Sequence, residues 1–193
     1  MINNQPKILI IAAEGFEESE LVVPFDLWTR FGYKCQIVSL CGTERIKSKD
    51  GISIVPDILW NDFLAKYQDL KSVPNDFGAI FLPGGPGYLE YLKSNQLKNL
   101  VKIFKNSPKF LTAICAAPMV LDNWKIIENY KISVFPGFKD QIKNNEVIDQ
   151  KSTIDRNVIT GQNPAAVFAF SLNVIKAISG QEKSDSFKKM MRL

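Results

Sequence analysis

Residues 109–118 read KFLTAICAAP, an apolar run that ends in a cysteine, two alanines and a proline. The run predicts a buried strand that turns sharply into a helix, with Cys115 at the corner. The alanines at 116 and 117 allow a tight turn, and Pro118 suits the first turn of a helix, where its missing N–H is not needed. The corner therefore has the form of a nucleophile elbow, with sulfur in place of the serine oxygen of hydrolases.

The local pattern leaves two interpretations of Cys115 open. A sulfur at a helix N-terminus faces unpaired N–H groups and the positive end of the helix dipole, which both favour the thiolate. We therefore expect the pKa of this thiol to lie well below the ordinary value of about 8.5. The alternative is an inert core residue, because free cysteine is among the most buried residue types.

The segments on either side of this corner alternate between strand and helix patterns. Apolar runs predict further strands over residues 7–12, 33–40, 76–82, 131–135 and 154–160. Helical patterns are expected from residue 17 to a stop at Gly32, and over 60–70, 96–106, 163–180 and 183–192, with a hairpin at 47–55. This alternation predicts a doubly wound α/β sandwich with a mostly parallel central sheet. Without a linker, repeat or low-complexity tract, residues 1–193 are expected to form a single domain.

Composition limits the classes of partner. The net charge is only +4, from 24 basic and 20 acidic residues, and the lysines are scattered, so nucleic-acid binding is not expected. Residues 1–6 lack the charged start of a signal peptide, and no apolar run approaches the roughly 20 residues of a membrane span. The three cysteines lack metal-site spacing, so no metal is expected, and a reducing cytoplasm is the favoured compartment.

The chain contains no histidine. This excludes Ser-His-Asp and Cys-His mechanisms, histidine metal sites and histidine pH switches. Any general acid–base catalysis must therefore use carboxylates, lysine, tyrosine, cysteine or water.

Two further stretches are candidates for the site. Glu17 and Glu18 open a predicted helix, where acidic side chains complement the dipole, whereas Glu20 lies inside the amphipathic pattern and could point inward. Residues 83–87 read PGGPG at the end of a predicted strand. The turn is either only a tight connection or a place where backbone N–H groups approach a ligand at the strand's C-terminal end. It is not a P-loop, because no GK[ST] follows.

Three motifs carry a family resemblance: EESE at 17–20, LPGG at 82–85 and AICAAP at 113–118. In order and spacing they resemble the ThiJ/PfpI superfamily, specifically its DJ-one branch, and the resemblance spans residue 7 to about residue 180. The aromatic residue before Pro136 resembles the bacterial YajL-like members. The resemblance implies a flavodoxin-like fold, a homodimer and no cofactor.

The resemblance also implies a set of site residues. The family's reactive cysteine matches Cys115, and its buried glutamate, which hydrogen-bonds that cysteine when protonated, matches Glu20. Its backbone donors match Gly84, Gly85 and Ala116. Many members carry a histidine near the cysteine where this chain has Phe135, so the Cys-His chemistry of protease and amidotransferase relatives is excluded.

Two functions follow as hypotheses. In the first, Cys115 and Glu20 act on small reactive aldehydes such as methylglyoxal, or on glycated protein groups, as a cofactor-independent glyoxalase III or protein deglycase of the stress response, with slow turnover. In the second, the chain is a non-enzymatic redox sensor or chaperone whose Cys115 is oxidised to the sulfinate. A purely structural flavodoxin-like domain is the third alternative. Cys115 is expected to be the most reactive thiol, because Cys35 and Cys41 flank a strand expected to be buried.

Overall fold

The computed structural model describes residues 5–193. Its main sheet has seven strands in the order β10-β11-β7-β6-β1-β2-β5. All neighbours in it pair in parallel except β10 and β11. The strands are β1 (Lys7–Ala12), β2 (Lys34–Ser39), β5 (Ile58–Leu59), β6 (Ala79–Leu82), β7 (Phe110–Ile114), β10 (Ser152–Asp155) and β11 (Val158–Gly161).

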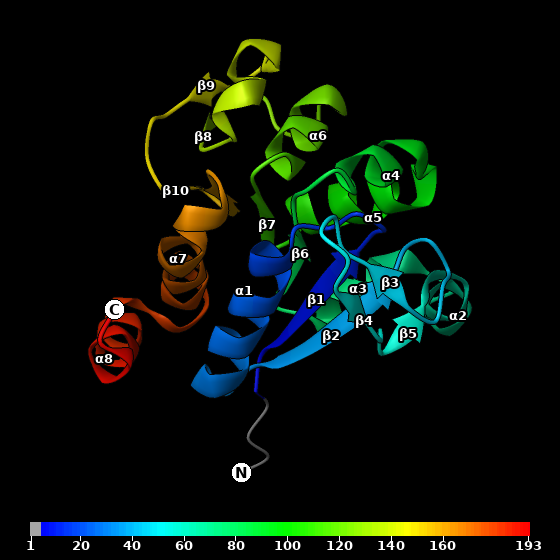
Figure 1. Cartoon of the computed structure of the whole chain (residues 1–193), viewed down its shortest axis with the longest axis horizontal. Coiled ribbons are helices and arrows are strands. Elements are labelled where there is room, and N and C mark those ends of the chain that lie inside the picture. The colour runs from blue at the N-terminus through cyan, green and yellow to red at the C-terminus, as the bar shows by residue number, and fades with distance from the viewer. Residues whose placement is uncertain (1–4) are drawn as a thin grey trace.

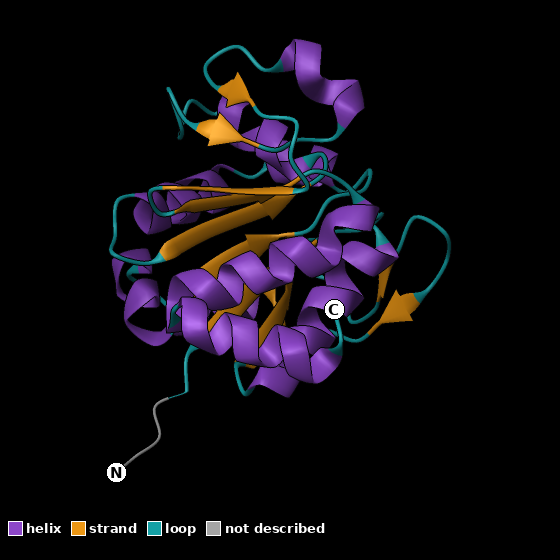
Figure 2. Cartoon of the chain, turned by 90° about the vertical axis from the view of Figure 1, so that its left-hand side faces the viewer, coloured by secondary structure: helices purple, strands orange, loops and turns teal. Residues whose placement is uncertain are grey.

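Helices cover both faces of this sheet (Figures 1 and 2). On one face lie α1 (Glu18–Phe31), α7 (Val167–Ser179) and α8 (Gln181–Met191). On the other lie α2 (Trp60–Lys66), α3 (Val73–Asp76), α4 (Tyr88–Lys93), α5 (Asn95–Lys105) and α6 (Ala117–Asn123). The predicted α/β sandwich with a mostly parallel sheet is confirmed.

The alternation of side chains along the strands explains why the runs are apolar throughout. In β1, Ile8 and Ile10 pack into the cluster with α1 and α7, whereas Leu9 and Ile11 pack into the cluster with α2, α4 and α5. Successive residues of a strand point to opposite faces, so a strand with helices on both sides needs apolar residues at every position.

The chain reverses its direction of winding between β1 and β6. From β1 the sheet grows one way through β2 and β5, and from β6 it grows the other way through β7 and β11. The loops that follow β1 and β6 meet at this point: the Glu17 N–H donates to the Gly84 carbonyl (3.0 Å), and the Gly87 N–H donates to the Gly15 carbonyl (3.0 Å). Crevices at such switch points are where open α/β sheets collect their sites.

Two small sheets stand outside the main one. The predicted hairpin is confirmed as β3 (Ile46–Lys47) and β4 (Ser53–Ile54), joined by a turn with Gly51 at a positive φ of 104°. The second pairs β8 (Lys131–Ile132) with β9 (Glu146–Val147) in parallel. Figure 1 shows this pair beside α6, above the edge of the main sheet.

Several predicted boundaries are wrong. The single strand predicted over 154–160 is the hairpin β10–β11, whose turn holds Arg156 at a positive φ of 53°. The predicted strand over 131–135 pairs only at 131–132, outside the main sheet. The strand predicted from residue 76 begins at Ala79, because residues 73–76 form a helix that packs on the sheet. The helix predicted over 60–70 ends at Lys66, and β5 and α4 were not predicted.

Within residues 5–193, none of the helices is both long and apolar enough to cross a membrane. The expectation that the chain lacks a signal peptide rests partly on residues 1–4, which lie outside the described residues.

Candidate active site

Cys115 occupies a sharp corner between β7 and α6. Its φ is 64°, in the left-handed region that residues with a side chain rarely adopt. Two neighbouring segments hold this backbone: the Cys115 N–H donates to the Gly161 carbonyl (2.9 Å), and the Cys115 carbonyl accepts the N–H of Phe135 (2.9 Å). The predicted elbow is therefore present, and the surrounding structure maintains its uncommon conformation.

Glu20 lies in the first turn of α1 and is 0% exposed. Glu17 is the N-cap of this helix, and its carboxylate accepts the Glu20 backbone N–H (2.9 Å) and the Ser19 hydroxyl (2.6 Å). The acid predicted merely to complement the dipole thus orients the turn that carries Glu20. Both carboxyl oxygens of Glu20 are buried and lack a well-aligned hydrogen-bond partner among the described residues.

Gly84 is the point at which Glu20 and Cys115 converge. A Cβ placed on Gly84 would lie 2.7 Å from the Cβ of Cys115 and would collide with Oε2 of Glu20. It would also lie 2.8 Å from the carbonyl oxygen of Ile114. Only a residue without a side chain fits there, so Gly84 allows the carboxyl group and the cysteine to lie against the same stretch of backbone.

Burial changes the acidity of Glu20. Loss of water around the carboxyl group, together with the negative charge of Glu17, raises its pKa from 4.5 to about 8. The Cys115 thiol, the Gly84 N–H and the Lys49 ammonium act in the opposite direction. At pH 7 Glu20 is therefore mostly protonated, with a fraction on the order of one tenth ionised.

The prediction that the Cys115 thiol has a lowered pKa is wrong. Burial raises the pKa of this thiol, and the adjacent Glu20 raises it further because two negative charges would lie side by side. The N–H groups of Gly85 and Ala116 favour the thiolate, but their effect is smaller. The helix-terminus argument fails because α6 is only seven residues long and the side chain is enclosed.

The predicted backbone donors divide between the two functional groups. The N–H groups of Gly85 and Ala116 act on the Cys115 sulfur, whereas the Gly84 N–H acts on the Glu20 carboxyl group. Gly85 has a positive φ of 84° and lies so close to residues 15–17 that a Cβ would collide with the Glu17 nitrogen. The structure thus brings all five predicted residues together.

The other two cysteines lie in different surroundings. Cys35 is half-buried in β2, and burial raises its pKa to about 12. Cys41 is exposed, because β2 ends at Ser39 and Cys41 lies in the loop beyond it. Cys41 therefore flanks β2 as expected but is exposed, whereas Cys35 lies within the strand. Cys115 is only 8% exposed, so its neighbours rather than exposure must account for any special reactivity.

Three aromatic side chains form a row beside the elbow: Phe135, which the resemblance placed near the cysteine, and Phe138 and Tyr88, which the sequence interpretation did not assign to the site. The ring centroids of Phe135 and Phe138 are 6.3 Å apart, and those of Phe138 and Tyr88 are 5.2 Å apart, both edge-to-face. Phe138 and Tyr88 pack against the buried cluster that contains Cys115. The available signal for Tyr88 was its position directly after the turn at 83–87.

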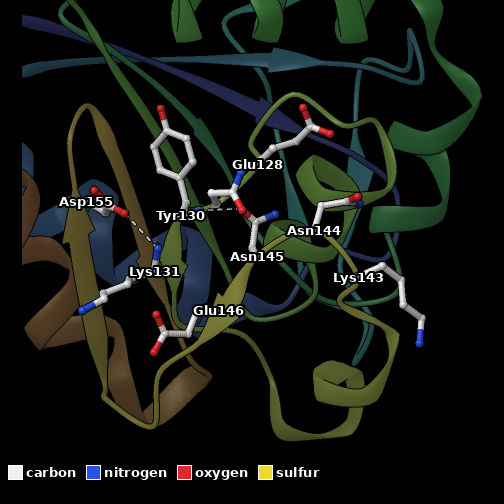
Figure 3. Close-up of a pocket in the computed structure, with 9 residues that line it drawn as sticks. Glu128, Tyr130, Lys131, Lys143, Asn144, Asn145, Glu146 and Asp155 are labelled. Atoms are coloured by element: carbon white, nitrogen blue, oxygen red, sulfur yellow. Dashed lines mark hydrogen bonds between the residues drawn. The ribbon is translucent and has the colours of Figure 1, made fainter.

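A cavity of about 690 Å³ lies away from this site (Figure 3). Its lining is polar and comprises Glu128, Asn129, Tyr130, Lys131, Lys143, Asn144, Asn145, Glu146 and Asp155. The Asn145 amide nitrogen donates to Asp122 (2.7 Å) and to the Ile127 carbonyl (2.9 Å). Asp155 accepts the Lys131 N–H (2.8 Å). These groups hold β8 and β9 in place. Nowhere in residues 5–193 do three potential metal ligands gather into a site.

A family model for the DJ-1/PfpI family matches residues 6–177. The chain belongs to the DJ-1/PfpI family. This confirms the superfamily indicated by the motifs, whereas the YajL-like branch stays a prediction.

Individual members of the DJ-1/PfpI family agree with this assignment. Protein dj-1beta of Drosophila melanogaster is 30% identical over 91% of this chain and 90% of its own length. The crystal structure of Drosophila melanogaster DJ-1beta superimposes with a TM-score of 0.87 and 27% identity, over 98% of both chains. A Caenorhabditis elegans relative named glutathione-independent glyoxalase DJR-1.2 is 29% identical over 100% of this chain and 99% of its own.

Proposed function

We propose that this protein is a cofactor-independent glyoxalase that converts small 2-oxoaldehydes such as methylglyoxal into 2-hydroxy acids. The observation that carries the proposal is the buried Glu20 carboxyl group, which meets Cys115 at Gly84 and whose pKa burial raises to about 8. A general base is most effective when its pKa lies near the working pH. The name of the Caenorhabditis elegans relative supports this class of reaction.

The first step is attack of sulfur on the aldehyde carbon. Ionised Glu20 takes the thiol proton as the sulfur–carbon bond forms, and the protonated carboxyl group returns that proton to the aldehyde oxygen. The product is a hemithioacetal on Cys115. The N–H groups of Gly85 and Ala116, which act on the sulfur, stabilise the negative charge that develops beside it.

The second step moves one proton between two carbons. Glu20 removes the proton from the former aldehyde carbon and returns it to the neighbouring carbon of the enediolate, while the hydroxyl proton moves from the first oxygen to the second. This leaves a thioester of a 2-hydroxy acid on Cys115. Water then cleaves the thioester and regenerates the thiol. One carbon is oxidised and its neighbour reduced, so the sum is oxoaldehyde plus water giving hydroxy acid, without an external oxidant.

The same chemistry extends to glycated groups. Early adducts of methylglyoxal with protein thiols and amines present the same carbon once they dissociate or exchange onto Cys115. A protein deglycase activity would therefore use the same two residues and the same donors.

A second candidate function is oxidation of Cys115 itself. Protonated Glu20 carries an O–H beside the Cys115 sulfur, and it can donate to an oxygen placed on that sulfur. Such a bond would stabilise the sulfinate and make the chain a redox sensor.

Lactate formation from methylglyoxal by the purified protein tests the first candidate. We expect slow turnover that rises between pH 6 and pH 8 as Glu20 ionises, is abolished in Cys115→Ser, and falls at least about 100-fold in Glu20→Gln. Asp26→Asn is the control for a carboxylate on the exposed side of the same helix, paired with Arg30, and should retain the Cys115-dependent reaction. Lactate formation that survives Cys115→Ser would refute the proposal. Peroxide oxidation without any lactate would favour the second candidate.

A further inference from the structure

We propose that the aromatic row of Phe135, Phe138 and Tyr88 forms the side of the site that selects the substrate, and that it favours 2-oxoaldehydes bearing an aromatic or bulky apolar group over methylglyoxal. This inference rests on the proposed function and adds its substrate class.

The row is attached to the site at its first end through Phe135. The Phe135 N–H donates to the Cys115 carbonyl (2.9 Å), which places this residue directly beside the elbow. Its side chain is nevertheless 40% exposed, although it is large and apolar. The next turn is closed by the Phe138 N–H, which donates to the Phe135 carbonyl (2.9 Å).

The other end of the row is attached through Tyr88. The Tyr88 N–H donates to the carbonyl of Gly85 (3.2 Å), the residue whose own N–H acts on the Cys115 sulfur. Phe138 lies between the two ends and contacts both rings in edge-to-face geometry. The row therefore connects the two backbone segments that flank the sulfur.

The chemistry of the row indicates what it recognises. Its members carry no charge, and aromatic rings attract a further ring in edge-to-face or offset contact. One such contact is worth a factor of about 2 to 12 in binding. An aryl group attached to the ketone carbon would gain this contact, whereas the methyl group of methylglyoxal is too small to cover a ring.

The first test compares phenylglyoxal with methylglyoxal, measured as mandelate and lactate. We expect kcat/KM to favour phenylglyoxal, and this preference to fall about three- to tenfold in Phe135→Ala and Phe138→Ala. Phe135→Leu keeps an apolar side chain but has no ring, and its preference for phenylglyoxal should fall by a similar factor. The matched control is Phe168→Ala in α7, a phenylalanine that is 45% exposed and lies outside the row; its preference should match the wild type.

The second test does not depend on turnover. Alkylation by iodoacetamide and by N-benzyl iodoacetamide is followed separately at Cys115 and at the exposed Cys41 by peptide mass spectrometry. The ratio of the benzyl to the unsubstituted rate should be at least about threefold higher at Cys115 than at Cys41, and the difference should vanish in Phe135→Ala.

The outcomes separate the two proposals. If no hydroxy acid forms but the benzyl reagent still favours Cys115, the glyoxalase proposal fails and the aromatic row stands. If lactate forms but the row variants change neither the kcat/KM preference for phenylglyoxal nor the ratio of alkylation rates, the row does not select the substrate. Faster reaction of the benzyl reagent in Phe135→Ala would also overturn the inference, because the ring would then obstruct the site.

Discussion

Replacing Gly84 with alanine tests whether the absence of a side chain at this position is what allows Glu20 and Cys115 to lie together. The added Cβ would lie 2.7 Å from the Cβ of Cys115, 2.8 Å from the Ile114 carbonyl oxygen and in collision with Glu20. Carbon atoms in ordinary contact are about 3.5–4.0 Å apart, so the surrounding groups must separate by about 1 Å. Each of the three neighbours is buried, which leaves little room for that movement.

The expected magnitude has two parts. Overpacking of a buried site costs about 1–3 kcal/mol, which for a domain of this size lowers Tm by roughly 5 °C. A displacement of about 1 Å between reacting groups costs on the order of 100-fold in rate. We therefore expect Gly84→Ala to remain folded, to melt a few degrees lower and to lose nearly all Cys115-dependent lactate formation.

Gly78→Ala is the matched control. Neither Gly78 nor Gly84 has a positive φ, so alanine causes no backbone strain at either position. A Cβ on Gly78 would find its nearest neighbours at 3.7 Å, which is ordinary contact. Its stability should lie within about 1 kcal/mol of the wild type, with normal turnover. Wild-type Tm and wild-type lactate formation in Gly84→Ala would refute the convergence of the two residues at this glycine.

Three further predictions concern Glu20, Phe135 and Asp122. Because burial raises the pKa of Glu20 from 4.5 to about 8, the folded chain keeps a proton that the unfolded chain has released. The contribution of Glu20 to stability should therefore be fully present below pH 4.5 and be lost, on the order of 4 kcal/mol, as the pH rises through 8. Urea unfolding at several pH values should show this loss as the difference between the wild-type profile and that of Glu20→Gln. Phe135→His adds a base beside Cys115 and should raise lactate formation at least about tenfold, since a positioned base contributes about 10²–10⁴-fold; unchanged kinetics would contradict that placement. Asp122 is 2% exposed and accepts the N–H groups of Lys143 (3.0 Å) and Asn144 (2.9 Å). Asp122→Ala should cost about 2–4 kcal/mol and speed hydrogen exchange at those two amides.

The sequence alone determined the architecture and the position of the candidate nucleophile. A strand enclosed by helices on both faces must be apolar at every position, and the runs at 7–12 and 110–114 carry that signal locally. The sharp turn at Cys115 could also be predicted, because a cysteine followed by small residues and a proline leaves few conformations for the corner. The absence of histidine excluded whole classes of chemistry before any contact was known.

Local sequence patterns predicted strand boundaries less accurately where the pairing of strands depends on distant segments. Residues 152–161 form two strands because the outer strand β10 pairs only with β11, and nothing in the apolar pattern of 154–160 marks the turn at Arg156. Residues 133–135 have a strand-like composition but join no sheet: the Ser133 N–H donates to the Thr160 hydroxyl, and the Phe135 N–H donates to the Cys115 carbonyl.

Only the tertiary structure decided the chemistry of the cysteine. The helix terminus is a local feature and favours the thiolate, but enclosure and the carboxyl group of Glu20 outweigh it. Glu20 lies 95 positions away in the sequence, and the fold brings it to Cys115 through the glycine between them. The pKa of a group depends on the water and charge around it in three dimensions, so the sequence could name this pair of residues but could not give the direction in which each one shifts.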